Sequence, residues 1–180
     1  MTREIKLTTA LTDEDVSSLR TGDKVLLSGK VYTARDAAHK RLFTELEQGL
    51  NPPFSMQGAV IYYVGPTPAP PGRVIGSAGP TTSSRMDVYT PRLHSLGVKA
   101  TIGKGRRGEE VKKSLMEHKA VYFGATGGAG ALLSRCITGS RVLAYEDLGP
   151  EAVRELEIRD FPLLVVNDSY GGELYVRVDS

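Results

Sequence analysis

The segment GEEVKKSLMEHKAVYFGATGGAGALL, residues 108–133, decides the fold class because it predicts three elements in succession. Its first part begins with acids and continues with lysines, the charge order that a helix macrodipole favours. The apolar run that starts at residue 120 predicts a buried strand. The glycines that follow predict a turn, and the last residues predict another helix. A helix–strand–helix unit of this kind is typical of α/β proteins.

The rest of the chain continues the same alternation in both directions. We expect helices over residues 11–19, 35–49 and from about 88 to 96, and strands over residues 3–8, 58–65, 98–105, 141–148 and 161–168. Thr12 is a candidate N-cap of the first helix, and Gly49 is expected to end the second. This order predicts an α/β fold with flanking helices that connect the strands of a mixed, partly parallel sheet.

Three stretches call for a more local interpretation. The sequence KVLLSGKVYTA, residues 24–34, predicts a tight hairpin that turns at Ser28 and Gly29. Residues 66–72 contain four prolines and predict an irregular loop. The sequence PEAVRELEI, residues 150–158, predicts a short helix with Pro150 at its first position.

Composition is that of an ordinary globular protein. The chain has 180 residues, of which 40% are hydrophobic and 24% charged, so we expect one domain over residues 1–180. A net charge of +2 shows no footprint of nucleic-acid binding. The apolar runs are too short to span a bilayer, and the N-terminus lacks the apolar stretch of a signal peptide. Both features favour a cytoplasmic location.

Cysteine is represented only by Cys136. An internal disulfide and a CxxC metal site are therefore excluded, and a reducing compartment is favoured. A buried structural thiol is the default role for such a residue. Thiolates of this chain alone cannot hold an iron–sulfur cluster, and we expect no metal site in it.

The sequence GPTTSSRMD, residues 79–87, is rich in hydrogen-bonding side chains. Four consecutive hydroxyl residues, Thr81 to Ser84, precede Arg85. A helix N-cap explains one hydroxyl, because Ser and Thr satisfy the first free N–H groups of a helix. Several hydroxyls beside a guanidinium are also suited to an anion, since the fork of Arg matches both oxygens of a carboxylate. Both interpretations stay open.

Three other loops carry candidate anion-binding groups. Arg35 lies where a strand meets a helix, and His39 follows one turn later. The alternatives are that Arg35 pairs with a surface acid and that His39 is an ordinary helix residue. The loops at Arg35, Thr81, Lys104 and Gly127 each adjoin a predicted strand. In α/β folds such loops can converge on one edge of the sheet.

Two further motifs have less specific interpretations. IGKGRRGEEVKK, residues 102–113, belongs to a group of six cations between Lys99 and Lys113. A nucleic-acid patch is conceivable, but a solvated helix face after a flexible turn is the simpler interpretation; Lys104 stands apart because glycines flank it. GATGGAGALL, residues 124–133, places Leu133 where a dinucleotide-binding GxGxxG motif counted from Gly128 needs its third glycine. NAD binding is therefore disfavoured, although backbone N–H groups there could bind a carboxylate.

Five motifs together resemble one family. They are ARDAAHKR (34–41), GPTTSSRMD (79–87), GKG (103–105), FGATGGAGALL (123–133) and YEDLGPEAVRELEIRDFPLLVVND (145–168). In order and spacing they are similar to the β subunits, or C-terminal domains, of class I iron–sulfur fumarate hydratases and of L(+)-tartrate dehydratases. The resemblance covers about residues 5–175 and implies a swivelling β/β/α domain.

The resemblance also implies an activity and a partner. Enzymes of this family are hydro-lyases that interconvert fumarate and L-malate, a step of the tricarboxylic acid cycle, with a 4Fe-4S cluster. Cysteines of the α subunit, or N-terminal domain, hold that cluster. With one cysteine, this chain resembles the split form, a heterotetramer of α and β subunits that is active only when both are present.

Residue roles follow from the same resemblance. Arg35, Arg85 and Lys104 match positions that bind substrate carboxylates, while Gly79 and Thr82 belong to the same substrate loop. Thr81 matches the position of the proton-abstracting base. A hydroxyl is a poor base until a neighbour activates it. The candidate activators are His39, Asp36 and Asp87 of this chain, or an acid of the α subunit.

Two other functions stay open beside fumarate hydration. The carboxylate-binding residues would serve L(+)-tartrate equally well, because tartrate has the same two carboxylates as malate and differs from it by one additional hydroxyl. A non-catalytic anion-binding module is the alternative of another class, favoured if the chain acts alone. A homodimer of the isolated chain is also conceivable, driven by apolar surface intended for the partner.

Overall fold

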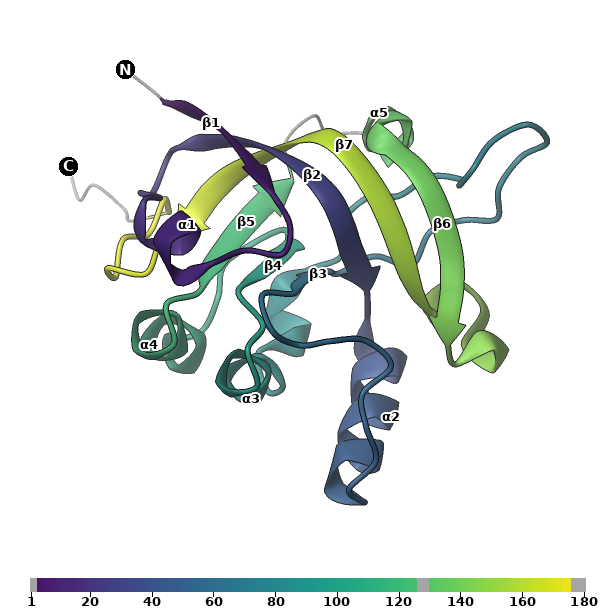
Figure 1. Cartoon of the computed structure of the whole chain (residues 1–180), viewed down its shortest axis with the longest axis horizontal. Helices are drawn as coiled ribbons and strands as arrows, with labels where there is room; N and C mark the ends of the chain where they lie inside the picture. Colours follow the sequence, from purple (N-terminus) through teal and green to yellow (C-terminus); the bar gives the residue numbers. More distant parts are fainter. Residues whose placement is uncertain (1–2, 126–129, 176–180) are drawn as a thin grey trace.

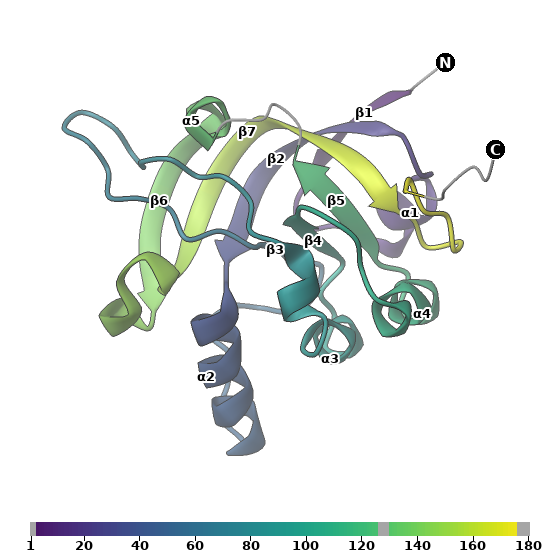
Figure 2. The same cartoon turned by 180° about the vertical axis from the view of Figure 1, so that it is seen from behind.

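The computed structural model describes residues 3–125 and 130–175, which form a mixed α/β fold (Figures 1 and 2). The strands are β1 (Glu4–Thr8), β2 (Lys24–Thr33), β3 (Val60–Tyr62), β4 (Ala100–Gly103), β5 (Val121–Ala125), β6 (Ile137–Ala144) and β7 (Val153–Asn167). The α-helices are α1 (Asp13–Ser17), α2 (Asp36–Glu47), α3 (Thr90–Ser95), α4 (Glu109–Glu117) and α5 (Gly130–Leu133). Short 3-10 helices cover Ser83–Met86, Ser134–Cys136 and Glu146–Glu151.

The sheet combines parallel and antiparallel pairs. Strands β2, β3, β4 and β5 are parallel neighbours, each joined to the next through a segment that contains a helix. The long strand β7 runs antiparallel to both β5 and β2, so the pairings return to the strand from which they began. Strand β1 extends the sheet beside β2, and β6 extends it beside β7. The predicted mixed, partly parallel sheet with flanking helices is confirmed.

The predicted hairpin at Ser28 and Gly29 is wrong. Residues Lys24–Thr33 form one strand of ten residues that pairs with β7 along most of its length. The register shifts between Leu27 and Gly29, and Gly29 has a φ of +110°. A bulge therefore occupies the place where the sequence predicted a turn. Gly suits this position because it adopts positive φ without steric cost.

The predicted helix over residues 150–158 is also wrong. Val153–Asn167 is a single strand of fifteen residues, and Pro150 lies in the preceding 3-10 helix. Leu156 and Ile158 are both buried, which is the two-residue period of a strand. Pairing with β2 on one side and β6 on the other overrides the helix preference of its Glu, Leu and Arg residues.

The other predicted elements are present, with changed lengths. Thr12 caps α1 in a reciprocal capping box with Asp15. The helix predicted after residue 87 is reduced to α3, which follows the 3-10 helix Ser83–Met86. The expected glycine turn after β5 falls partly on residues 126–129, which lie outside the described residues.

Two large apolar layers hold the fold together, and a smaller cluster joins Val111 and Leu115 of α4 to Tyr122 of β5. One layer is enclosed by the strands and includes Val25, Phe123 and Phe161. The other lies between the sheet and the helices and includes Leu42 of α2 and Leu93 of α3. Figures 1 and 2 show α2, α3 and α4 on the same side of strands β3 to β5. The helix layer thus leaves the carboxyl ends of the parallel strands as one edge from which loops emerge.

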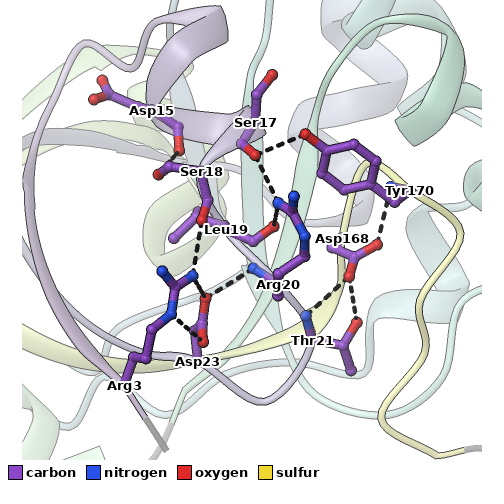
Figure 3. A network of polar contacts seen from close by, with 10 residues as sticks. All are labelled: Arg3, Asp15, Ser17, Ser18, Leu19, Arg20, Thr21, Asp23, Asp168 and Tyr170. Carbon is purple, nitrogen blue, oxygen red and sulfur yellow. Dashed lines mark hydrogen bonds and ion pairs between the residues drawn. The ribbon is translucent and has the colours of Figure 1, made fainter.

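A polar network fastens the two ends of the described chain to each other (Figure 3). The Asp168 carboxylate, which is 5% exposed, accepts hydrogen bonds from the Thr21 backbone and hydroxyl and from the backbone N–H groups of Tyr170 and Gly172. The Tyr170 hydroxyl donates to the Ser17 carbonyl at 2.8 Å. This network stabilises the edge of the fold that is built from the segments around α1 and β7.

Within the described part of the chain, no helix has the length and apolar character needed to cross a membrane.

Candidate functional site

The candidate site lies where β2, β3 and β4 end. Arg35 follows β2, the loop that leads to Thr81 and Arg85 follows β3, and Lys104 follows β4. Because these strands are parallel neighbours, their carboxyl ends meet at one edge. The structure therefore brings together three of the four loops that we expected to converge. The fourth, at Gly127, lies outside the described residues.

Residues 79–87, called the hydroxyl loop because they include Thr81 to Ser84, are attached to this edge by backbone hydrogen bonds. The Thr81 N–H donates to the Tyr63 carbonyl at 2.7 Å, and the Ser83 N–H donates to the Lys104 carbonyl at 2.9 Å. Thr82 and Lys104 form a parallel bridge, as neighbouring strands do. Both of these side chains are exposed. The bridge thus places Thr82 and Lys104 side by side on adjacent segments.

Simple helix capping does not account for the four hydroxyls. Thr82 is the N-cap of the 3-10 helix Ser83–Met86, yet its side chain makes no capping hydrogen bond. Ser83 is buried, and its hydroxyl bonds to the hydroxyl of Tyr122 at 2.8 Å. The Thr81 hydroxyl takes part in none of the hydrogen bonds between residues that the structure describes, and its side chain is half-buried. Helix capping therefore leaves hydroxyl groups of this loop unused, and they are open to a ligand.

Arg85 reaches the beginning of α2. Its guanidinium forms an ion pair with the carboxylate of Asp36, the first residue of that helix. Both side chains are more than a third exposed, at 49% and 39%. An exposed pair of this kind is weak, worth about 0–1 kcal/mol. Arg85 thus stands at the site with a partner that an incoming carboxylate can replace.

Arg35 is the residue immediately before α2, and its side chain lies against the chain that leaves β3. A Cβ atom placed on Gly65 would come within 2.7 Å of Arg35 Nη1 and 3.0 Å of its Cδ. The Arg35 Nε is buried without a hydrogen-bond partner among the described residues. The alternative of a surface ion pair is not realised, because none of the ion pairs between described residues includes Arg35.

His39 is packed inside the helix layer. Its Nδ1 is 2.8 Å from the Arg35 carbonyl oxygen, which can only accept, so Nδ1 carries the hydrogen. The ring stacks on Tyr89 with centroids 5.2 Å apart. Burial lowers the pKa of His39 to about 4, so the imidazole is neutral near pH 7. Its full burial and its bond to Arg35 favour the alternative of a packing residue over a role in activating Thr81.

Asp87 is committed to a structural network. Its carboxylate accepts from Arg107 Nε and from the Gly108 N–H, both at 2.7 Å. The Arg107 guanidinium also donates to the hydroxyls of Thr101 and Thr90, at 3.1 and 2.8 Å. Asp87 therefore has little capacity left to activate Thr81, and Arg107 holds the end of the hydroxyl loop against β4 and α3.

No sequence pattern indicated this role for Arg107. It belonged to the cations that we interpreted as a solvated helix face, but Arg107 and Lys99 are buried, at 4% and 8% exposure. Lys99 donates to the carbonyls of His118 and Lys119 at the end of α4. Arg106, the neighbour of Arg107, is exposed. No one-dimensional pattern separates the buried arginine from the exposed one.

The remaining candidate positions frame the site. The loop at Gly79 approaches the start of α5, where the Ala78 N–H donates to the Gly130 carbonyl at 3.2 Å. Cys136 is half-buried beside β6, and burial raises the pKa of its thiol above the ordinary value. Within the described ranges there is no group of three or more His, Cys, Asp or Glu side chains that could hold a metal ion.

Comparison with known proteins gives a consistent result. Residues 1–178 match the family model described as Fumarase C-terminus. A Methanocaldococcus jannaschii protein, provisionally named L(+)-tartrate dehydratase subunit beta, is 39% identical over 175 residues, covering 94% of this chain and 90% of that protein. Fumarate hydratase 2 of Leishmania major is 37% identical over 166 residues, covering 91% of this chain but 29% of that enzyme. A provisionally named class I fumarate hydratase of Geobacillus stearothermophilus is 34% identical over 182 residues, covering 98% of this chain and 34% of that enzyme. The chain thus spans about a third of the length of these fumarate hydratases.

Proposed function

Because the chain belongs to the family of fumarase C-terminal domains, we propose that it is the β subunit of a two-chain hydro-lyase that interconverts fumarate and L-malate. In this proposal the chain supplies the residues that bind the substrate carboxylates, and an α subunit supplies the rest of the site. The proposed setting is the cytoplasm, and the proposed pathway is the tricarboxylic acid cycle.

One observation carries the proposal. The Thr82–Lys104 bridge and the Arg85–Asp36 ion pair place cations from two separate loops on the edge where Arg35 also lies. A C4 dicarboxylate carries two negative ends and needs at least two cationic anchors. Guanidinium groups bind a carboxylate through paired hydrogen bonds, while an ammonium acts as a point charge. Arg35, Arg85 and Lys104 therefore suit the binding of both ends of one substrate.

The same edge offers a group for proton transfer. In the direction from malate to fumarate, a neighbouring base takes the proton of the Thr81 hydroxyl, and Thr81 Oγ1 then takes a proton from C3. The C–H electron pair forms the double bond between C3 and C2, and the hydroxyl leaves C2 as hydroxide, which receives the proton held by the base and departs as water. A threonine hydroxyl needs an activating neighbour for this step. Asp36 lies on the same edge, but it is paired with Arg85. An acid of the α subunit is the other candidate for this role.

A 4Fe-4S cluster is implied by the family resemblance, and the residues of this chain do not fit it. Cluster binding needs several thiolates, whereas the chain has one cysteine, half-buried beside β6. We therefore propose that the cysteines of the α subunit hold the cluster and that the two chains form a heterotetramer.

A second substrate is favoured by a specific observation. The M. jannaschii protein named for tartrate dehydration matches this chain over 90% of its own length, and its name describes a separate β subunit. L(+)-tartrate is therefore the alternative substrate. It is a C4 dicarboxylate with one hydroxyl more than malate, so the same cations would bind its ends, and contacts from the α subunit would make the distinction.

The test is an anaerobic assay of fumarate hydration and L(+)-tartrate dehydration. The chain alone, a cluster-loaded α subunit alone and their mixture are compared, and size-exclusion chromatography shows whether the two associate. We expect association and fumarate turnover in the mixture only. Turnover of tartrate alone would identify the alternative substrate. Association without turnover of either substrate, with the cluster intact, would contradict the enzymatic proposal and favour a non-catalytic anion-binding module.

A further inference from the structure

The hydroxyl of Tyr122 lies between the two loops that carry the proposed anchors. Tyr122 is a fully buried residue of β5. Its hydroxyl is 2.8 Å from the Gly105 carbonyl oxygen and 2.8 Å from the Ser83 hydroxyl. A carbonyl can only accept, so the Tyr122 hydroxyl donates to Gly105 and accepts from Ser83. One buried oxygen thus connects the loop of Arg85 to the turn of Lys104.

The Arg107 guanidinium also connects the loop of Arg85 to the segment of Lys104. Its carbon lies 4.8 Å from the centroid of the Tyr122 ring. Through Asp87 it holds the end of the hydroxyl loop, and Arg107 itself belongs to the segment that follows Lys104. Tyr122 and Arg107, together called the brace, are both buried. Neither side chain is available to a ligand, so their effect on binding must pass through the loops that they join.

We propose that the brace fixes the separation of Arg85 from Lys104 and thereby selects dicarboxylates of four-carbon length. The inference rests on the proposed function, in which the cations bind both ends of one substrate, and it assigns Arg85 and Lys104 to opposite carboxylates. Tyr122 and Arg107 are positioning residues. When two anchors are fixed, a diacid of the wrong length cannot reach both without strain, whereas mobile anchors adjust to several lengths.

The variant Tyr122→Phe tests this inference because it removes one oxygen and keeps the ring. Tyr170→Phe is the matched control, since it also removes a hydroxyl that donates to a backbone carbonyl at 2.8 Å but lies near α1. Competitive inhibition by malonate, succinate and glutarate is measured on the reconstituted complex. Tyr122→Phe loses the hydrogen bonds to Gly105 and Ser83. We expect the KM for fumarate to rise about tenfold, with kcat changed by less than about twofold. The preference for succinate over glutarate should fall by at least about threefold.

A merely structural role would not change the preference among chain lengths. An unchanged inhibitor profile in an active Tyr122→Phe complex would overturn the inference and leave the proposed function intact. If Tyr122→Phe does not fold, Ser83→Ala removes the hydrogen bond between Ser83 and Tyr122 from the loop side and should change the inhibitor profile in the same direction.

An inactive wild-type complex would count against the proposed function instead. The brace is then tested in the isolated chain by amide hydrogen exchange. Faster exchange in Tyr122→Phe over residues 81–87 and 104–108, but not in Tyr170→Phe, is the expected result. Equal exchange rates in these two segments for wild type and Tyr122→Phe would overturn the proposed role of the brace.

Discussion

Arg85 and Asp36 form an ion pair that joins the hydroxyl loop to the first residue of α2. The pair has a consequence for ligand binding, because Asp36 occupies the guanidinium that the proposed substrate needs. A substrate carboxylate must displace Asp36 or share Arg85 with it. Asp36 therefore competes with the substrate unless its carboxylate also takes part in the chemistry.

Asp36→Asn distinguishes these roles. If Asp36 only competes, its removal should lower the KM for fumarate by up to about fivefold, the limit set by an exposed ion pair, and leave kcat within about twofold. Steady-state kinetics of the reconstituted complex provide the measurement. Asp147→Asn is the matched control, because Asp147 is also an exposed acid paired with an arginine, Arg41, that is not among the proposed anchors. A loss of about a hundredfold in kcat would instead identify Asp36 as the activator of Thr81.

Gly65→Ala should weaken substrate binding through Arg35. The added Cβ would come within 2.7 Å of Arg35 Nη1, so the guanidinium must move. We expect the KM to rise about tenfold or more, since a displaced anchor loses much of its binding energy. A double-mutant cycle with Arg35→Ala gives the decisive measurement. In the Arg35→Ala background, Gly65→Ala should have little further effect, and full additivity would show that Gly65 acts by another route.

The sequence predicted the elements whose local pattern agrees with their tertiary surroundings. Helices α2 and α4 and strands β3 to β5 each have one clear pattern, and each was predicted. Strands β2 and β7 were predicted only in part, because local signals placed a turn inside β2 and a helix over the first residues of β7. Ser28-Gly29 is a good turn sequence, and residues 150–158 favour a helix, yet both segments pair with each other in the sheet. Sheet pairing between distant segments decided the outcome in both cases.

The candidate site, like the fold, could be predicted from the sequence only in part. Exposed cations in the segments that follow strands, such as Arg85 and Lys104, could be selected from the sequence because their chemistry is visible in one dimension. The supporting contacts could not. Ser83 bonds to a residue 39 positions away, and Arg107 bonds to a residue 20 positions away. Whether an arginine supports a loop from within or lies in solvent depends on such contacts, and residue type alone does not determine them.

Asp168 should make stability depend on acid pH. Burial alone would raise the pKa of the Asp168 carboxyl, but the hydrogen bonds from Thr21, Gly172 and Tyr170 outweigh it and hold the pKa below its ordinary value. A carboxyl with a lowered folded-state pKa stabilises the fold above the unfolded-state pKa of about 3.9, and this contribution is lost as pH falls further.

Asp168→Asn should therefore destabilise the isolated chain by about 1–3 kcal/mol at pH 7, because two donors lose their acceptor oxygen. Urea unfolding at pH 7, 5 and 3.5 provides the measurement. The difference between wild type and variant should narrow below about pH 4. Glu146→Gln, at an exposed position, serves as the control and should change stability little. A difference that stays constant over this pH range would contradict the role assigned to the Asp168 charge.

Arg85→Lys tests whether the shape of the guanidinium, and not only its charge, binds the substrate. Lysine keeps the positive charge but cannot form two parallel hydrogen bonds to a carboxylate. We expect kcat/KM for fumarate in the reconstituted complex to fall by about a hundredfold, the cost of losing one charge-assisted bond and misplacing the substrate. Arg141→Lys is the matched control, because Arg141, on β6, is also exposed and is paired with the carboxylate of Glu155. A normal yield of complex in both variants ensures that the comparison concerns binding and chemistry. Activity of Arg85→Lys equal to that of Arg141→Lys would remove Arg85 from the substrate site, and with it the argument that the Asp36 pair holds this arginine ready for a ligand.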